Sequence, residues 1–206
     1  MSDLFQEPLR SSVPIDLPDA RILFFRQALS PSDAQRYFDD LYESVQWTEE
    51  EVVVWGKRHK QPRLVAWFGD PGAKYTYSGS TLNPQPWTPL LQQLRSEIEE
   101  LADARFNSVL LNLYRNHLDR MGWHSDDEPA LGRDPIIASL SLGESRIFQM
   151  KHKRRPELGI KSFELASGSL LLMSGSTQRY WLHSVRKESR PVAARINLTF
   201  RRIVGA

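Results

Sequence analysis

The stretch Arg195-Ile196-Asn197-Leu198-Thr199-Phe200-Arg201 decides the fold of this chain of 206 residues. Apolar and polar residues alternate along it, which is the pattern of a β-strand with one buried face. Its polar face carries two guanidinium groups, and a guanidinium offers a planar fork that binds a carboxylate through two parallel hydrogen bonds. We therefore expect this strand to face a ligand that carries carboxylates. A strand whose polar face is simply solvated is the alternative.

The triplet His124-Ser125-Asp126 and the later His183 form a candidate metal site. In a strand, residues i and i+2 project from the same face, so His124 and Asp126 are expected side by side. Two histidines and one carboxylate on one face of a metal leave positions open for a cosubstrate and dioxygen, as in non-haem Fe(II) oxygenases. The alternative is a chance pair, since the chain holds five histidines. We expect the histidines without a carboxylate at ligand spacing to be non-ligands: His59, His117 and His152.

An iron site beside two arginines indicates a dicarboxylate cosubstrate such as 2-oxoglutarate. The segment from Phe106 to Arg115 is also predicted to be a strand, and its Asn112 and Tyr114 share a face. An amide and a phenol there can hydrogen-bond a keto acid, although an ordinary strand with two polar residues explains them as well. Because a strand rises about 3.3 Å per residue, Arg195 and Arg201 start about 20 Å apart. We assign Arg195 to the distal carboxylate and place Arg201 near the metal end or behind the metal ligands.

The remaining pattern predicts helices first and short strands afterwards. Residues 1–20 are rich in proline and charge and are expected to form a loose arm. Ser30-Pro31 and Thr88-Pro89 each place an N-cap residue before a proline and an apolar run at helical spacing, so each begins a helix that packs outside a sheet. The later strands are typical of an antiparallel sandwich or barrel. They are expected at 106–115, 136–142, 146–150, 162–165, 169–173, 181–185 and 195–203.

Composition sets bounds that fit this pattern. The chain has no cysteine, which excludes disulfides and thiolate metal sites. Its first residues lack the basic and apolar regions of a signal peptide, and no stretch approaches the roughly 18 apolar residues of a membrane helix. We expect a cytoplasmic monomer without a membrane partner. The formal charge of +2 means that affinity for nucleic acid must come from local patches.

Two basic segments are candidates for such patches. Val52 to Trp55 and a basic tip with Lys57 and Arg58 are expected to form a hairpin. Cations neutralise phosphates and aromatic rings stack on bases, so interleaved residues of both kinds suit a nucleic-acid surface. The second segment, Lys151 to Arg155, contains Lys153 and Arg154 and is expected to contact a phosphate backbone. An exposed basic turn is the alternative for each segment.

From roughly Trp47 to Ile203, the chain resembles the AlkB family of Fe(II)/2-oxoglutarate-dependent nucleic-acid dealkylases, most closely its double-strand-DNA repair branch in animals. The motifs that carry the resemblance occur in the family's order: Asn112-Leu113-Tyr114, His124-Ser125-Asp126-Asp127-Glu128, Gly168-Ser169-Leu170-Leu171-Leu172-Met173, His183-Ser184 and Arg195 to Arg201. The resemblance implies an α+β, mainly β fold, a double-stranded β-helix of jelly-roll type with flanking helices and an N-terminal nucleotide-recognition lid.

The resemblance also implies residue roles. Iron would be bound by His124, Asp126 and His183, and the cosubstrate would be held by Asn112, Tyr114, Arg195, Asn197 and Arg201. In related repair enzymes, an apolar residue matching Trp55 fills the gap that a flipped base leaves, and an aromatic residue matching Tyr77 stacks on that base. The related animal enzymes carry phenylalanine at both positions, which leaves the preference for duplex open.

The implied activity is oxidative demethylation of N-alkylated DNA bases, N1-methyladenine and N3-methylcytosine, with release of formaldehyde and succinate. These bases are positively charged, so we expect Tyr77, Asp127 and Glu128 to favour them, and a plain acidic turn is the alternative for the two carboxylates. An RNA demethylase and a 2-oxoglutarate oxygenase of proteins or small molecules are the alternative functions. We divide the chain into an N-terminal arm (1–20), the helices with the lid (21–104) and the catalytic jelly-roll core (105–206), all within one structural domain.

Overall fold

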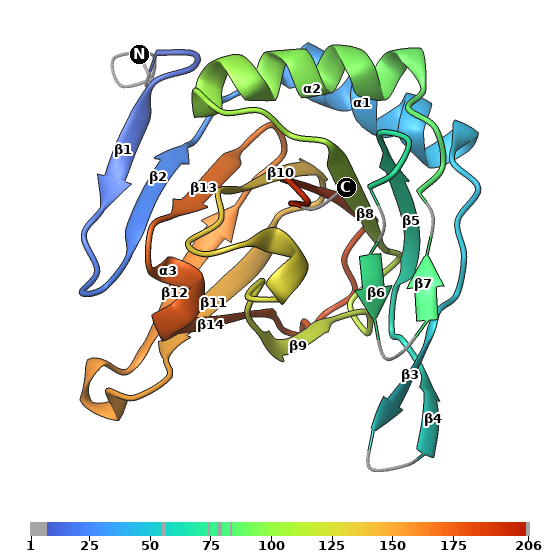
Figure 1. The fold of residues 1–206 in the computed structure, drawn as a ribbon. Coiled ribbons are helices and arrows are strands. Elements are labelled where there is room, and N and C mark those ends of the chain that lie inside the picture. The colour runs from blue at the N-terminus through green and yellow to red at the C-terminus, as the bar shows by residue number, and fades with distance from the viewer. Residues whose placement is uncertain (1–7, 55–56, 74, 78–79, 83, 205–206) are drawn as a thin grey trace.

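The computed structural model describes residues 8–54, 57–73, 75–77, 80–82 and 84–204, and within 52–58 and 74–83 it describes only backbone. Its largest element is a seven-stranded antiparallel sheet in the order β1-β2-β13-β10-β15-β8-β5. Strand β15 lies between β10, which pairs with residues 195–200, and β8, which pairs with residues 195–201 (Figure 1 labels β8 and β10). The strands are β1 (Ser12–Ile15), β2 (Arg21–Phe25), β5 (Leu64–Gly69), β8 (Ser108–Tyr114), β10 (Ile137–Gly143), β13 (Leu170–Ser174) and β15 (Arg195–Arg201).

A second, four-stranded antiparallel sheet has the order β12-β11-β14-β9. Its strands are β9 (Met121–His124), β11 (Arg146–His152), β12 (Ile160–Leu165) and β14 (Trp181–Val185). From β8 onward the chain passes back and forth between the two sheets, except that β11 and β12 are consecutive in the smaller one. The two sheets face one another, which is the jelly-roll arrangement expected from the resemblance. The strand positions predicted from the sequence are therefore confirmed to within a few residues.

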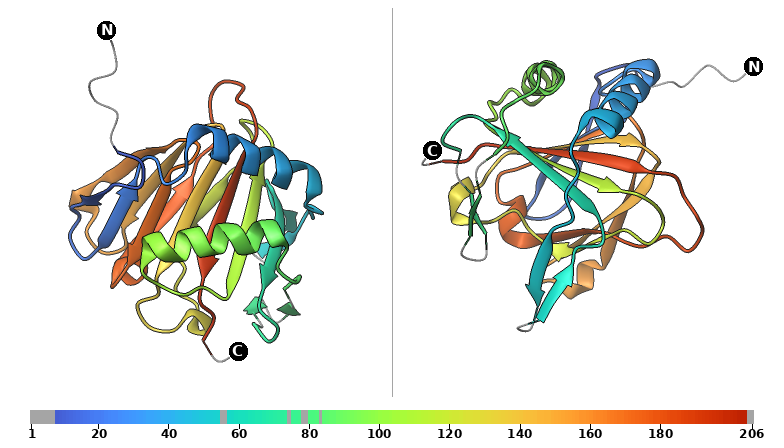
Figure 2. Two further views of the ribbon diagram at one scale, coloured as in Figure 1. Left: turned by 90° about the horizontal axis from the view of Figure 1, so that it is seen from above. Right: turned by 90° about the vertical axis from the view of Figure 1, so that its right-hand side faces the viewer.

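Two long helices, α1 (Pro31–Ser44) and α2 (Pro89–Ala102), cover the outer face of the larger sheet (Figure 2). Both begin as predicted: the Ser30 hydroxyl accepts from the Asp33 amide at 3.1 Å, and the Thr88 hydroxyl accepts from the Leu91 amide at 3.2 Å. The shorter helices are α3 (Thr177–Tyr180) and the 3-10 turns η1 (Pro129–Leu131) and η2 (Pro156–Leu158). Among the described residues, none of the helices has the length and apolar character needed to cross a lipid bilayer.

The apolar side chains form two cores on either side of the larger sheet. One core lies between this sheet and the helices and contains Ile196, Leu198 and Phe200 of β15. The other lies between the two sheets and includes Phe148 and Trp181. Because the apolar face of β15 packs against the helices, its polar face is turned toward the space between the sheets.

The expected loose arm is wrong for residues 12–15, which form β1 and pair with β2. The physical reason is that β2 would otherwise be an unpaired edge strand, and β1 satisfies its backbone groups. The hairpin predicted around Val52 is confirmed as β3 (Glu51–Val54) paired with β4 (Lys57–Lys60), but its basic tip is wrong for Lys57 and Arg58, which belong to the second strand because they pair with Val54 and Val53. A second small hairpin joins β6 (Tyr75–Tyr77) and β7 (Ser80–Leu82).

Candidate active site

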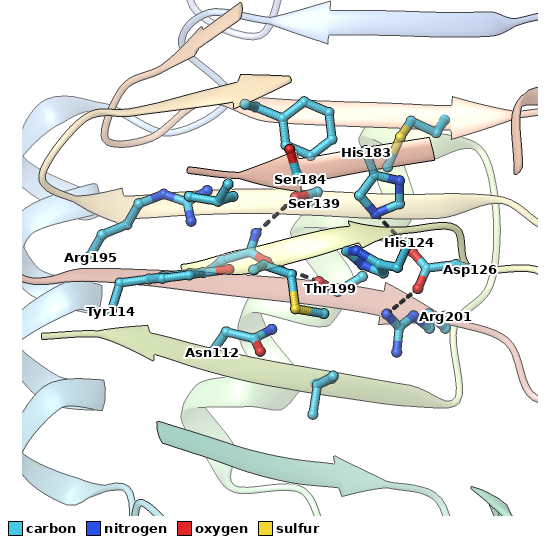
Figure 3. Close-up of a pocket in the computed structure, with 16 residues that line it drawn as sticks. Asn112, Tyr114, His124, Asp126, Ser139, His183, Ser184, Arg195, Thr199 and Arg201 are labelled. Atoms are coloured by element: carbon cyan, nitrogen blue, oxygen red, sulfur yellow. Dashed lines mark hydrogen bonds and ion pairs between the residues drawn. The ribbon is translucent and has the colours of Figure 1, made fainter. Parts of the chain in front are cut away.

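The polar face of β15 lines a cavity between the two sheets, as its alternation predicts. Its register sets Arg195 opposite Tyr114 and Asn197 opposite Asn112 on β8. Figure 3 shows Arg195 and Tyr114 at one end of this inner cavity and the candidate metal ligands with Arg201 at the other. The inner cavity is lined by Leu110, Asn112, Tyr114, Met121, His124, Asp126, Ser139, Phe148, Met173, His183, Ser184, Val185, Arg195, Asn197, Thr199 and Arg201.

The three predicted iron ligands meet at one point. His124 ends β9 and lies opposite His183 of β14, with the ring centroids 4.1 Å apart. One potential ligand atom from each of His124, Asp126 and His183 lies within 4.8 Å of the others. These three residues are the only cluster of this kind among the described residues.

Asp126 reaches the cluster in a different way from the one expected. Strand β9 ends at His124, so Asp126 lies in the following turn and the argument from a shared strand face is wrong. Two contacts hold it in place instead. Arg201 donates from Nη2 to the Asp126 carboxylate at 2.5 Å, and the Asp126 amide donates to Oε1 of Gln178 at 3.0 Å. The direction of this carboxylate is therefore set by residues far away in the sequence.

The electrostatics of the cluster suit a metal. Burial, with the neighbouring His124, lowers the pKa of His183 to about 3, so its imidazole is neutral at neutral pH and has a lone pair available. Burial alone would raise the pKa of Asp126, but Arg201, His183 and His124 hold it below its ordinary value. The Nδ1 of His183 is buried without a hydrogen-bond partner among the described residues. His124 lies with Nδ1 2.9 Å from the Gly122 carbonyl, and a proton on Nδ1 leaves Nε2 as a ligand atom.

The far end of the inner cavity is built around a buried arginine. Arg195 is 1% exposed and donates from Nη2 to the Ser141 hydroxyl at 2.9 Å. Its Nε and Nη1 have no hydrogen-bond partner in the described part of the chain. Burial lowers the pKa of Arg195 to about 10, which still leaves it charged at neutral pH. A buried cation with open donors calls for an anion, so the residues present fit the distal carboxylate of a keto acid.

The two predicted amides are already engaged with protein groups. Asn197 donates from Nδ2 to the Ser139 hydroxyl (2.8 Å) and accepts from the Thr199 hydroxyl (3.0 Å). Asn112 accepts from Nε of Arg63 at 2.7 Å. Sequence reasoning missed Ser139, although its alternation with apolar neighbours in strand β10 could have found it. It also missed Arg63 and Gln178, which carry no periodic signal.

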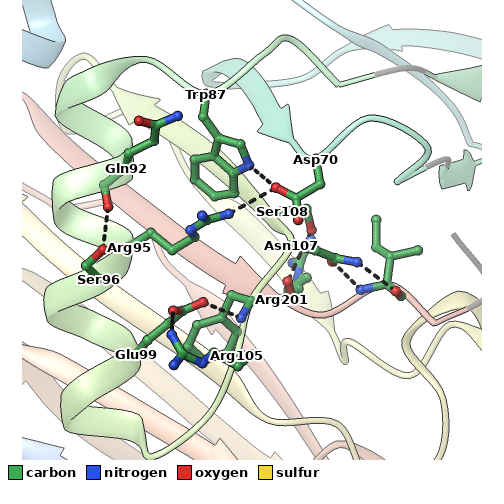
Figure 4. Close-up of polar contacts among 12 residues, drawn as sticks. Asp70, Trp87, Gln92, Arg95, Ser96, Glu99, Arg105, Asn107, Ser108 and Arg201 are labelled. Carbon is green, nitrogen blue, oxygen red and sulfur yellow. Dashed lines mark hydrogen bonds and ion pairs between the residues drawn. The ribbon is translucent and has the colours of Figure 1, made fainter.

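The C-terminal end of β15, at Arg201, is held by a polar network outside the inner cavity (Figure 4). Asn107 donates from Nδ2 to the Ile203 carbonyl at 2.9 Å, and Oδ1 of Asn107 accepts from the Ile203 amide at 2.7 Å. The Asn107 amide also donates to the Arg201 carbonyl at 3.1 Å. Asp70 joins this region to α2 by accepting from Trp87 at 2.7 Å and from Arg95 at 3.0 Å. These contacts hold the backbone from which Arg201 reaches Asp126.

A second, outer cavity of about 560 Å³ adjoins the inner one at the metal cluster. The two cavities share five residues: Leu110, Met121, His124, Asp126 and Arg201. The rest of the outer cavity is lined by Thr48, Glu50, Glu51, Gln61, Arg63, Val65, Ala66, Trp67, Gln85, Ser108, Ser125, Glu128, Leu131 and Ile203. A molecule in the outer cavity and a cosubstrate in the inner one would both reach the metal.

The predicted substrate residues are placed in different ways. Glu128 lines the outer cavity, whereas Asp127 forms an ion pair with Lys153 at 2.8 Å and lines neither cavity described above. Arg154 is exposed on the turn after β11. Trp55 lies outside the described residues, and for Lys57, Arg58 and Tyr77 only the strand backbone is described.

Comparisons with known proteins agree with this geometry. OsALKBH1 has a solved structure with a TM-score of 0.61 and 15% identity, which covers 92% of this chain and 100% of that chain, so the fold is shared. The alpha-ketoglutarate-dependent dioxygenase alkB homolog 3 of Bos taurus is 45% identical over 83% of this chain and 62% of its own length. The DNA oxidative demethylase ALKBH2 of Mus musculus is 40% identical over 84% of this chain and 76% of its own length.

The chain spans 62% to 66% of the length of the alkB homolog 3 proteins that it matches, from Bos taurus, Homo sapiens, Mus musculus and Rattus norvegicus. Residues 21–201 match the model of the 2OG-Fe(II) oxygenase superfamily. The chain therefore belongs to the 2OG-Fe(II) oxygenase superfamily, and within it to the AlkB-type dioxygenases, with Fe(II) and 2-oxoglutarate as cofactors.

Proposed function

We propose that this chain catalyses the oxidative demethylation of N-alkylated DNA bases, with N1-methyladenine and N3-methylcytosine as substrates. The observation that carries the proposal is the position of His124, Asp126 and His183 where the inner and outer cavities meet. The choice of DNA is supported by relatives named DNA oxidative demethylases at 38% to 40% identity. Fe(II) and 2-oxoglutarate supply an oxidation of the N-methyl group by dioxygen, after which formaldehyde, succinate and carbon dioxide leave.

The residues of the inner cavity bind and orient the cosubstrate in this proposal. His124, Asp126 and His183 hold the iron, and Arg195 binds the distal carboxylate through its open donors. Asn112 and Asn197 line the cavity between these two ends, Tyr114 lines it beside Arg195, and all three restrict the orientation of the keto acid. Arg201 keeps the Asp126 carboxylate in one orientation through its 2.5 Å hydrogen bond, so the ligand set is arranged before the metal binds.

The outer cavity receives the base. A base inside a duplex must be extruded first, at a cost of a few kcal/mol that is lower when methylation has broken its pairing. Glu128 lines this cavity beside the metal cluster, and its carboxylate would favour the positive charge of the methylated base. Asp127 is less available for that role because its carboxylate already accepts a hydrogen bond from Lys153. Insertion of Trp55 into the duplex and stacking of Tyr77 on the base remain predictions.

Contacts with the DNA backbone are assigned to Lys57, Arg58, Lys153 and Arg154. Arg154 is exposed and can reach a phosphate directly. Lys153 donates to Asp127 (2.8 Å) and to the Gln178 carbonyl (2.9 Å), so a phosphate would have to compete with these two acceptors. We therefore expect Arg154 to contribute more to DNA affinity than Lys153.

The test is formaldehyde release from an N1-methyladenine oligonucleotide, single-stranded and duplex, with Fe(II), ascorbate and 2-oxoglutarate. We expect release by the wild type and by His117→Ala, whose histidine lies outside the metal cluster, and none by His183→Ala. Succinate formation without formaldehyde from either DNA would contradict the DNA proposal and direct the search to RNA, protein or small-molecule substrates.

A further inference from the structure

Arg146 is a second buried arginine near the Arg195 end of the inner cavity. It is the first residue of β11 and is 1% exposed. Its Nη2 donates to the carbonyls of Asp119 (2.8 Å) and Arg186 (2.5 Å), and its Nη1 donates to the carbonyl of Asn116 (3.5 Å). Its Nε lies 3.5 Å from a carboxylate oxygen of Glu188. Three backbone carbonyls and one carboxylate thus hold Arg146 in place.

These contacts join two loops, each of which directly adjoins a predicted cosubstrate residue. Residues 115–120 connect β8 to β9 and follow Tyr114 directly, and residues 186–194 connect β14 to β15 and precede Arg195 directly. The loops also bond to each other, since the Glu188 amide donates to the His117 carbonyl at 2.9 Å. Arg146 therefore holds both the loop that follows Tyr114 and the loop that precedes Arg195, the two residues at this end of the cavity.

Arg146 and Arg195 both lie against the ring of Tyr114. Their guanidinium carbons are 5.5 Å and 5.2 Å from the ring centroid, within the range of cation–π attraction. Tyr114 is 2% exposed and can hardly move between them. Tyr114 lines the inner cavity, whereas Arg146 does not.

Among the described residues, the ion pairs at this end leave the positive charge of Arg195 without a carboxylate. Arg146 and Arg195 are positive, Glu188 is the carboxylate beside Arg146, and Asp119 is paired with Arg115 at 2.8 Å. A second carboxylate on the keto acid would balance the remaining charge, whereas a keto acid with one carboxylate would not reach it.

We propose that Arg146 is a positioning residue for the distal carboxylate of 2-oxoglutarate, acting through Tyr114, Arg195 and its own charge. This role rests on the proposed function only in that Arg195 receives that carboxylate. It predicts that Arg146 matters for a keto acid with a distal carboxylate and not for one without it.

The test compares the binding of 2-oxoglutarate and of 2-oxobutyrate, which lacks the distal carboxylate, to protein loaded with Mn(II) so that no turnover occurs. For Arg146→Met we expect the Kd of 2-oxoglutarate, from calorimetry, to rise about tenfold or more while that of 2-oxobutyrate stays within about twofold. Arg146→Lys keeps the charge but can reach fewer carbonyls, so its value should lie in between. An equal change for both keto acids, or no change for either, would overturn the proposal.

A second variant keeps the proposal testable should Arg146→Met fail to fold. Glu188→Gln leaves Arg146 in place and removes the carboxylate that offsets its charge. We expect 2-oxoglutarate to bind about threefold tighter and 2-oxobutyrate to bind unchanged. Unchanged or weaker binding of 2-oxoglutarate would overturn the role of Arg146. Wild-type protein that binds neither keto acid would instead contradict the proposed function, so the two failures are distinguishable.

Discussion

At Arg195, removal of water from a charged group decides what the side chain can bind. The guanidinium is 1% exposed and donates to the Ser141 hydroxyl, and its Nε and Nη1 have no hydrogen-bond partner among the described residues. A buried cation is unfavourable unless its hydrogen bonds are completed, so its open donors favour a carboxylate over water or a neutral group. An ion pair between an arginine and a carboxylate on the protein surface would be weak and unselective.

We expect Arg195→Met to raise the KM for 2-oxoglutarate roughly 10- to 100-fold, since hydrogen bonds to a charged group contribute about 1.5–3 kcal/mol. Steady-state succinate formation measures this. Arg190→Met, at an exposed arginine of the loop that precedes β15, is the control and should leave the KM unchanged. An unchanged KM in the Arg195 variant would show that the distal carboxylate binds elsewhere.

Asp119 gives a pH-dependent contribution to stability. Burial alone would raise its pKa, but hydrogen bonds and charge from Arg115 hold the pKa below the ordinary value of 3.8. A carboxyl with a lowered pKa stabilises the fold above its unfolded pKa, and this stability is lost as the pH falls. Asp119→Asn should therefore lower the free energy of unfolding at pH 7 by about 2 kcal/mol.

Below about pH 4, the difference between wild type and Asp119→Asn should shrink, because the wild-type carboxyl then also becomes protonated. Urea unfolding at both pH values measures it. Asp16→Asn, at an exposed carboxylate, is the control and should change little at either pH. A difference that is the same at both pH values would exclude this ionisation as its cause.

At the scale of elements, the two long helices stabilise the fold but contribute no residue to either cavity. Their buried faces, including Tyr37 and Leu41 of α1 and Leu94 of α2, pack on the face of the larger sheet that points away from the cavities. Their N-caps are local features that each satisfy a backbone amide at the helix start. Changes to these caps should affect stability and leave the site alone.

Thr88→Ala is expected to lower the free energy of unfolding by about 1 kcal/mol, the usual contribution of an N-cap. The KM for 2-oxoglutarate should not change, because α2 lies outside the sheet. Ser96→Ala removes a hydroxyl from the middle of the same helix and should be close to neutral. Thermal or urea unfolding compares the two, and an equal loss in both variants would argue against the cap.

At the scale of the whole molecule, the two sheets contribute different halves of the site. The smaller sheet and the turn after β9 bring the metal ligands, while β8 and β15 of the larger sheet bring Tyr114, Arg195 and Arg201. A cosubstrate that spans the inner cavity would tie the sheets together. Binding should therefore stabilise the whole fold and not only the loops around it.

We expect Mn(II) at about 100 times its Kd to raise the Tm by roughly 5–10 °C, since binding there adds about 2.7 kcal/mol. Added 2-oxoglutarate should raise the Tm further, and more in the presence of the metal than without it. Differential scanning fluorimetry measures both, with His183→Ala as the variant that should lose the metal effect. An equal rise in that variant would place the metal elsewhere.

Local patterns in the sequence predicted the elements and the side of β15 that lines the inner cavity. Alternation along Arg195 to Arg201 predicted which side chains face the cavity, and Ser30 and Thr88 predicted the helix starts, because both signals depend on neighbours within a few residues. The types of residue at His124, Asp126 and His183 were enough to predict a metal site. Their side chains were expected on one strand face, however, and that was wrong for Asp126.

The tertiary structure alone decided how distant parts of the chain complete the site. Asp126 is directed by Arg201 and Gln178, Asn112 is held by Arg63, and Arg146 joins loops that are separated by more than sixty residues. No short pattern encodes such contacts, since each depends on which strands become neighbours. The sequence by itself therefore determined the chemistry available to this protein. The packing of two sheets decided where that chemistry meets, because only packing brings buried charges and their partners together.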